Sequence, residues 1–182
     1  MKKLLKTMLA TFTAATAFTG ILGVLLSAGT AAASDSQPRF TNNGDGTIRD
    51  NRTGLIWLKD TNCLIIKEKR WDLAVEQTGI LADGKCGLSD GSREGDWRLP
   101  NIQEMQSLLD YSQYYPALPA GHPFTVVLDP LQTLYWTSTS LPPDIEMGED
   151  YAWTVELNYG YIDRIFKQGR NWHNAWPVRN GQ

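Results

Sequence analysis

Residue types that commonly carry enzyme chemistry are scarce in this sequence. Its 182 residues include two cysteines and two histidines, and the cysteines lack the CxxC spacing of metal and redox sites. Neither a Ser/His/Asp arrangement nor a glycine-rich phosphate loop is present. His122 precedes a proline, and a single histidine in such a loop is more often structural. We therefore expect a protein that is not an enzyme and that uses no cofactor or metal.

The longest apolar stretch lies at the N-terminus and predicts an export signal. Three lysines within the first six residues precede an apolar segment from about residue 8 to residue 26, and Ala31–Ala33 form a small-residue cleavage site. An uncleaved membrane anchor is the alternative, because the apolar segment is nearly long enough to span a bilayer. Cleavage after residue 33 would leave no membrane span and would place the protein in the periplasm or outside the cell.

The rest of the chain has the length of one ordinary domain. We expect residues 34–38 to form a short disordered lead and residues 39–182 to form a single domain. Loss of residues 1–33 removes three lysines, so the formal net charge falls from −3 to −6. Because a nucleic-acid-binding protein needs a basic face, this balance argues against a nucleic-acid partner.

Cys63 and Cys86 both belong to the part of the chain that would be exported. An exported protein with two cysteines most simply pairs them, and a metal or catalytic thiol pair is the alternative. Closing the loop between these cysteines would stabilise the fold by about 3 kcal/mol in the chain-entropy model. The sequence therefore favours a disulfide.

The stretch around which the domain is organised is a corner between an extended segment and a helix, at residues 96–104. Pro100 disfavours a helical conformation for the residue before it. Asn101 is then a good N-cap, and Glu104 completes a capping box three residues later. Apolar spacing continues the helix to about residue 111.

The side chains before this corner alternate between two sides. Trp97 and Leu99 should face the core, and Arg98 should face the other way. We expect Arg98 to be a structural ion-pair partner of Glu104 or Asp96. All the residues of the corner are therefore expected to be structural.

Hydrophobic patterns predict the remaining elements. Residues 39–50 predict a hairpin around an Asn/Gly/Asp/Gly turn; a calcium loop is the alternative, although the oxygens do not fall at its alternate positions. A helix is predicted over residues 70–81, with one face formed by Trp71, Ala74, Val75 and Thr78. Strands are predicted at residues 55–58, 134–140, 151–157, 162–167 and 175–179.

Two of these strands carry tryptophans that we expect to be structural. Trp57 lies in a continuous apolar run that is typical of a buried strand. Trp153 shares one face of its strand with Val155 and Leu157. Residues 114–130 contain four prolines and should be irregular, ordered by the packing of Tyr115, Phe124 and Val127.

Several motifs, taken in order along the chain, resemble the Lcl C-terminal domain family. The resemblance covers nearly all of the predicted domain, and its motifs lie at residues 39–57, 96–108, 135–139, 151–153, 158–160 and 177–179. This family is named after the tail domain of a bacterial collagen-like adhesin. Many of its members carry a cysteine pair at the positions of Cys63 and Cys86.

The resemblance implies an α+β, C-type-lectin-like fold with two helices, small antiparallel sheets and long loops. The founding domain is associated with sulfated glycosaminoglycans and with trimerisation beside a collagen stalk. This chain has no Gly-X-Y tract and a negative net charge, so neither property is carried over. The resemblance implies an adhesin-like module that recognises a glycan or an envelope or extracellular protein; a structural or assembly module of the envelope without a small ligand is the alternative.

C-type-lectin-like domains usually present ligands on long loops, which correspond here to residues 141–150 and 169–174. A sugar ring needs a flat apolar surface beside directed hydrogen-bonding groups. The residues that would supply these groups are Trp136, Tyr151, Arg164, Lys167, Arg170, Asn171 and Trp172. The alternative for each aromatic residue is packing in the core, which is favoured more for Trp153 than for Trp172.

Charged residues near the C-terminus allow two further interpretations. Arg164, Lys167, Arg170, His173 and Arg179 would together form a basic patch for sulfate or carboxylate, although solvated side chains with scattered partners are favoured. The acids of the loop at residues 141–150 could hold calcium. That loop lacks the Glu-Pro-Asn and Trp-Asn-Asp motifs of calcium-dependent lectins, so a solvated loop is favoured.

An enzyme is the remaining alternative. Residues 98–104 also resemble a segment of the formylglycine-generating enzymes, which share the lectin-like fold. Those enzymes use a reactive cysteine pair late in the chain, whereas both cysteines here lie early. A binding module is therefore favoured.

Overall fold

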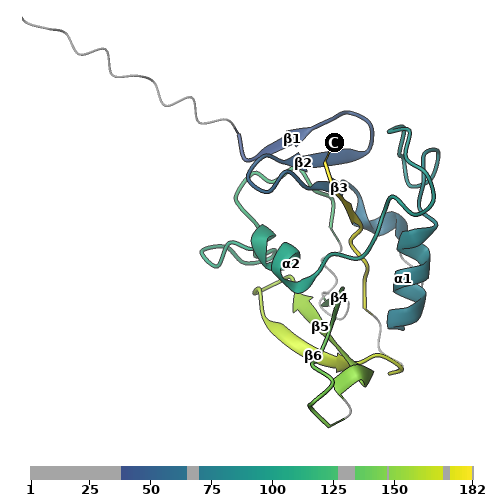
Figure 1. Cartoon of the computed structure of the whole chain (residues 1–182). Coiled ribbons are helices and arrows are strands. Elements are labelled where there is room, and N and C mark those ends of the chain that lie inside the picture. Colours follow the sequence, from purple (N-terminus) through teal and green to yellow (C-terminus); the bar gives the residue numbers. More distant parts are fainter. Residues whose placement is uncertain (1–37, 65–69, 127–133, 147, 170–172, 182) are drawn as a thin grey trace, which may run out of the picture. The chain divides into compact units, whose positions relative to one another are not determined.

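Two small antiparallel sheets and two α-helices form the fold in the part of the chain that the structure describes. The computed structural model describes residues 38–64, 70–126, 134–146, 148–169 and 173–181, and these residues all belong to one unit, Ser36–Gln182. Figure 1 shows the first sheet at the top, the second at the bottom and α2 between them. The arrangement is an α+β fold, as predicted.

The first sheet joins the two ends of the domain. Its order is β1-β2-β3-β7, with β1 at Phe40–Asn42, β2 at Thr47–Asp50, β3 at Ile56–Leu58 and β7 at Val178–Arg179. The hairpin of β1 and β2 is the predicted one, and its turn uses its own oxygens: Asp45 Oδ1 accepts from the backbone nitrogen and the hydroxyl of Thr47. Trp57 pairs with Val178, so the last strand closes the sheet against β3.

The second sheet is a meander of β4 at Leu134–Ser140, β5 at Tyr151–Glu156 and β6 at Ile162–Phe166. A register shift between Trp136 and Ser140 bends β4 against β5. Short 3-10 helices, η1 at Thr61–Leu64 and η2 at Gly148–Asp150, precede α1 and β5. The central strand, β5, has a fully buried side chain on each face, Ala152 on one and Val155 on the other.

The corner at residues 96–104 has the predicted geometry. Helix α2 spans Ile102–Leu108, and Asn101 and Glu104 form both hydrogen bonds of the capping box. Trp97 and Leu99 are 1 % and 2 % exposed, whereas Arg98 is only half-buried. The C-terminal end of α2 is stabilised by two arginine side chains, because Arg39 and Arg52 both donate hydrogen bonds to the carbonyl oxygen of Ser107.

Tryptophans form the centre of the core. Trp57, Trp97, Trp136 and Trp176 are all fully buried. Trp57 and Trp176 pack edge-to-face with ring centroids 5.6 Å apart, and the indole nitrogen of Trp176 donates to Leu58 O. The indole nitrogen of Trp97 donates to the hydroxyl of Ser92, so the N–H group is not buried without a hydrogen-bond partner.

Cys63 in η1 and Cys86 in the loop after α1 form a disulfide, which confirms the predicted pairing. Their Cα atoms lie 5.4 Å apart, within the usual range for such a bond. The bond fastens the glycine-rich loop to the segment that follows β3.

Both helices are shorter than predicted. Helix α1 spans Trp71–Gly79 instead of residues 70–81; of its predicted face, Ala74 and Thr78 are fully buried as expected, whereas Val75 is 39 % exposed. Helix α2 stops at Leu108 because Leu109 has an extended backbone, which lets Leu109 turn back into the core.

Two packing predictions are also wrong. Tyr115 was expected to order the proline-rich segment, but it is 48 % exposed, and Phe124 does this by packing on Trp176. Trp153 is only half-buried, whereas Ala152 on the opposite face of β5 is fully buried. The clean alternation failed because β5 packs on both faces. Val127, also expected to pack there, lies outside the described residues.

Candidate ligand-binding site

The loop between β4 and β5 is held in shape by its own backbone. The amide of Ile145 donates to Pro142 O, and the amide of Gly148 donates to Ile145 O. A Cβ at position 148 would overlap the Pro142 carbonyl oxygen, so the turn requires glycine there. The loop is therefore a folded structure and not a loose connection.

Lys167, a predicted ligand-binding residue, fastens this loop to the sheet. Its Nζ donates to Glu149 O at 2.6 Å and to Ser140 Oγ at 2.7 Å, and it lies 4.3 Å from the ring centroid of Trp71. The ammonium group is therefore already engaged in two hydrogen bonds and a cation–π contact within the protein. Lys167 therefore positions the loop and is not free to meet a ligand.

A hollow of about 210 Å³ opens between this loop and the edge of the second sheet. Its lining residues are Leu141, Ile145, Glu146, Gly148, Tyr151 and Arg164. The ring of Tyr151 is held against Phe166 with centroids 5.6 Å apart, and Ile145 is 44 % exposed. The hollow combines an apolar wall with one cation and one carboxylate, a pattern suited to a ligand with both an apolar face and polar groups.

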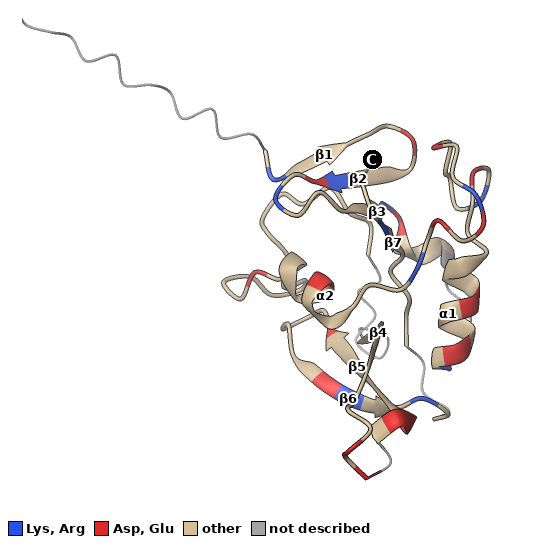
Figure 2. Cartoon of the chain, in the orientation of Figure 1, with Lys and Arg blue, Asp and Glu red and all other residues tan. Residues whose placement is uncertain are grey.

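Arg164 is the cation of this hollow. It lies on β6 opposite Trp153, its side chain is exposed, and within the described residues it forms no ion pair. Figure 2 shows acidic residues along the neighbouring loop between β4 and β5, and charges of both signs on β6. Tyr151 and Arg164 are thus two predicted site residues that the structure brings together.

The other predicted site residues are either buried or outside the described residues. Trp136 is fully buried and packs edge-to-face on His173, with centroids 4.8 Å apart, so it offers no face to a ligand. The prediction for Trp136 is wrong because β4 is covered on that face by α1 and the chain before β7. Arg170, Asn171 and Trp172 lie outside the described residues.

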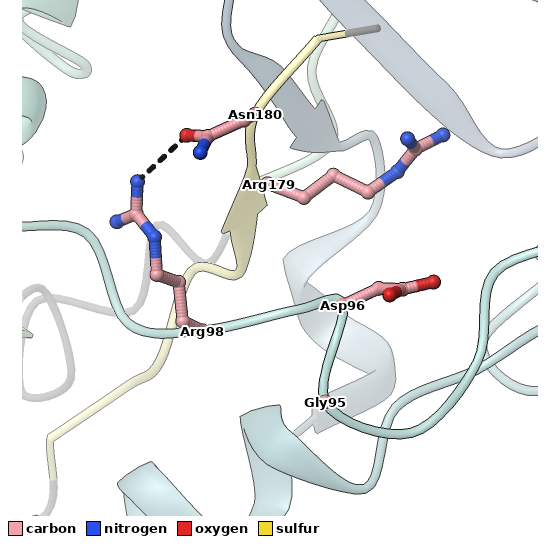
Figure 3. Close-up of a pocket in the computed structure, with 5 residues that line it drawn as sticks. All are labelled: Gly95, Asp96, Arg98, Arg179 and Asn180. Atoms are coloured by element: carbon pink, nitrogen blue, oxygen red, sulfur yellow. Dashed lines mark hydrogen bonds between the residues drawn. The ribbon is translucent and has the colours of Figure 1, made fainter.

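A second hollow, of about 360 Å³, lies beside the corner and is lined by Gly95, Asp96, Arg98, Arg179 and Asn180. Figure 3 shows the guanidinium groups of Arg98 and Arg179 pointing in different directions, with Arg98 bonded to Asn180 at 3.2 Å. Two arginines in one hollow would suit an anion only if their charges were free.

Both arginine charges in the second hollow are already neutralised. Arg98 forms a bidentate pair with Glu104, with Nη2–Oε1 at 2.7 Å and Nη1–Oε2 at 2.8 Å, which confirms the predicted ion pair. Arg179 pairs with the buried carboxylate of Asp90 at 3.2 Å and lies over the ring of Trp97. This second hollow is therefore a structural joint.

The pKa of Glu104 follows from these contacts. Burial alone would raise it, but the hydrogen bonds from Arg98 and from the Asn101 backbone, together with the Arg98 charge, lower it below its ordinary value. The same partner raises the pKa of Arg98. The pair stays ionised, and it holds the start of α2 to the extended segment that precedes the helix.

No cation site is evident in the described parts of the chain, where no group of three or more His, Cys, Asp and Glu side chains could hold a metal ion. The acids of the loop between β4 and β5 include Asp144, Glu146, Glu149 and Asp150, all exposed. They contribute negative potential beside the hollow that Arg164 lines.

The sequence interpretation missed a group of exposed tyrosines. Residues Tyr111, Tyr114 and Tyr115 meet Tyr159 and Tyr161 on one surface. The available signal was the absence of charge in two tyrosine-rich segments, at residues 111–121 and 157–162. Nothing in that pattern revealed that the two segments would meet.

Comparison with known proteins identifies the family. No curated protein and no solved structure matches the chain, so the C-type-lectin-like arrangement stays a prediction. Among the described residues, no helix combines the length and the apolar character needed to cross a membrane. The sequence matches the Lcl C-terminal domain over residues 46–179, a span that includes the corner, the disulfide and the hollow of Tyr151 and Arg164, and the chain therefore belongs to the Lcl C-terminal domain family.

Proposed function

We propose that this domain is an exported, non-catalytic binding module that recognises a glycan or a protein of the cell envelope or the extracellular space. The observation that carries the proposal is the hollow where Tyr151 and Arg164 meet the folded loop between β4 and β5. An aromatic edge, an exposed aliphatic side chain and a cation that pairs with no described residue provide contact area and direction for a ligand.

The chemistry of the hollow limits the ligand. Arg164 would receive a carboxylate, a sulfate or a ring hydroxyl, while Ile145 and Tyr151 would contact an apolar face. Glu146 beside them disfavours a ligand of high negative charge density. A glycan with few charges or a peptide segment fits better than a polyanion.

Export is supported by the disulfide and by the N-terminal segment. The Cys63–Cys86 bond is typical of proteins that fold in an oxidising compartment. The basic and apolar N-terminal residues that precede Ala31–Ala33 have the order of a signal peptide. Both features favour the periplasm or the outside of the cell.

A non-catalytic role is supported by the location of the titratable groups. The described residues with clearly shifted pKa values are Arg98, Glu104, Asp110, His122 and Tyr159; none lines the hollow of Tyr151 and Arg164, and Arg98 in the second hollow is paired with Glu104. Catalytic sites usually hold such groups within a pocket. The shifts here follow from ion pairing, local hydrogen bonds and burial in the scaffold.

The test is a glycan array with and without calcium, combined with pull-downs from envelope extracts, using the purified protein. We expect a ligand whose binding Arg164→Ala weakens about tenfold, the loss of one good charge-assisted contact. Arg93→Ala is the matched control, because Arg93 is also exposed and lines neither hollow.

Three outcomes would count against this proposal. Equal loss of binding in the Arg93→Ala and Arg164→Ala proteins would show that only net charge matters. A silent array together with a recovered envelope protein that ignores Arg164→Ala would favour an assembly module instead. Turnover of a bound sugar would show that the domain is an enzyme.

A further inference from the structure

Five of the seven tyrosines form one exposed patch, called the tyrosine patch below. Its members are Tyr111, Tyr114, Tyr115, Tyr159 and Tyr161, with exposed fractions between 47 % and 73 %. They come from the segment after α2 and from the turn between β5 and β6. A contiguous exposed aromatic surface on a soluble domain usually marks a binding site.

The members of the tyrosine patch contact one another. Tyr115 and Tyr159 pack edge-to-face with centroids 5.1 Å apart, and the Tyr159 hydroxyl donates to the Tyr115 hydroxyl at 3.1 Å. The ring centroids of Tyr114 and Tyr115 lie 6.2 Å apart, and those of Tyr159 and Tyr161 lie 5.8 Å apart. The patch is therefore continuous and not a scatter of single side chains.

Tyr111 contacts the other segment of the patch at Gly160. A Cβ on Gly160 would lie 3.0 Å from the Tyr111 ring, so the ring rests directly on the turn backbone. Gly160 also has a φ of +77°, a conformation that favours glycine. Both the turn and the ring depend on the absence of a side chain at this position.

Backbone hydrogen bonds fix the two segments to each other. The amide of Tyr115 donates to Asn158 O at 2.8 Å, and the amide of Ala117 donates to Leu157 O at 2.7 Å. These bonds place the rings before any ligand arrives. A platform that is already ordered loses little conformational entropy on binding.

The tyrosine patch carries no charge of its own. Residues 111–121 and 157–162 contain no Asp, Glu, Lys or Arg, and Figure 2 shows the loop after α2 almost entirely in tan. The neighbouring acids are used locally: Asp110 accepts from Ser112, and Glu156 accepts from the amides of Asn158 and Tyr159. An anionic partner would find no lysine or arginine in these two segments.

The hydroxyl of Tyr159 is held in its neutral form. The hydrogen bond with Tyr115 raises the pKa of Tyr159, which keeps its hydroxyl protonated. The patch thus offers aromatic faces together with uncharged donors and acceptors. A sugar is complementary to such a surface, because its ring has an apolar face and a rim of hydroxyl groups.

We propose that the tyrosine patch is a second binding site and that it takes an uncharged oligosaccharide. Its rings would stack on the sugar faces, and its hydroxyls would bond to the sugar rim. A protein partner is less suited, because interface centres rely on arginine and tryptophan as well as tyrosine, and the patch has neither. The site is distinct from the hollow of Tyr151 and Arg164.

The test titrates the purified protein with cellohexaose, maltohexaose and chitohexaose while the tyrosine ring resonances are followed by NMR. We expect at least one of these sugars to shift the patch resonances. Tyr114→Ala and Tyr161→Ala should each weaken that binding about fivefold or more, since each removes a stacking surface. Tyr114→Phe keeps the ring and should weaken it less.

Controls separate this site from the hollow. Tyr151→Ala and Arg164→Ala should leave hexasaccharide binding unchanged, and raising the salt concentration should have little effect because no charge is involved. Loss of binding in the Tyr151→Ala protein would assign the sugar to the hollow and would overturn this inference while supporting the other.

Two further results would overturn the inference. One is the absence of any shift with all three hexasaccharides at millimolar concentration. The other is a concentration-dependent dimer, measured by sedimentation, that Tyr114→Ala abolishes; this would show that a second copy of the chain covers the patch. Thermal unfolding at the wild-type temperature would confirm that each variant is folded.

Discussion

Two hollows in this domain contain arginine, and they differ in what the arginine already binds. Beside the corner, Arg98 and Arg179 pair with Glu104 and Asp90. Beside the loop between β4 and β5, Arg164 forms no ion pair with any described residue. The larger hollow is thus structural and the smaller one is the candidate site. Charge lining a hollow indicates a ligand only when the protein has left that charge unpaired.

The largest effect is expected from replacing Trp97, the buried residue beside the structural hollow. Trp97 forms the surface over which Arg179 lies and is 1 % exposed. We expect Trp97→Ala to lower the free energy of unfolding by about 3–5 kcal/mol, because it leaves a large cavity and removes the partner of Ser92. Urea denaturation measures the change. A loss below 1 kcal/mol would show that the corner is not the centre of the fold.

The second test breaks one ion pair of the structural hollow. Asp90→Ala leaves Arg179 without its carboxylate partner, at a position where the arginine side chain is only 17 % exposed. We expect a loss of about 2–3 kcal/mol in the free energy of unfolding, since an uncompensated cation would stay partly buried. Asp83→Ala, in the same loop but exposed, is the matched control. Equal losses would mean that the loop turn, and not the pair, matters.

The third test uses pH. The pKa of Glu104 is lowered in the folded protein, so its ionised form stabilises the fold above the unfolded value of 4.5, and this contribution is lost as pH falls below it. Glu104→Gln should cost about 1 kcal/mol at pH 7, because Arg98 is half-exposed and its pair is partly screened. Unfolding curves from pH 7 to pH 3 should show the difference between the two proteins shrinking with acid. A constant difference would contradict the pairing.

The smallest stability effect is expected in the candidate site. Arg164→Ala should change the free energy of unfolding by less than about 0.5 kcal/mol, because the side chain is exposed and forms no ion pair with any described residue. The same variant should lose ligand binding. A loss above 1 kcal/mol, measured in the same urea experiment, would place Arg164 with the structural arginines and end the contrast between the two hollows.

The corner was predictable because its signals are local. Pro100, Asn101 and Glu104 act within one turn of helix, and Arg98 reaches Glu104 across that same turn. The hairpin and the disulfide were predictable for similar reasons, from turn residues and from the presence of two cysteines. Each depends on few neighbours, so the pattern along the chain carried enough information.

The candidate site was only partly predictable because its residues depend on distant neighbours. Trp136 and Tyr151 both lie in strands with mixed patterns, yet one is buried and the other lines a hollow. Lys167 looked available and is instead bonded to Ser140 and to the Glu149 backbone. Which face of β4 is covered depends on α1, more than sixty residues away.

The sequence by itself determined the family, the α+β class, the corner and the cysteine pair, because short-range sterics and capping act between near neighbours. Only the tertiary structure decided that Arg179 is paired with Asp90, that Arg164 has no ion pair among the described residues, and which tyrosines gather. Those outcomes come from segments that meet across the fold, such as the turn at Tyr159 and the segment at Tyr115. Pairing between charges that are distant in the sequence, and contact between distant rings, are properties of the packed chain that no local pattern encodes.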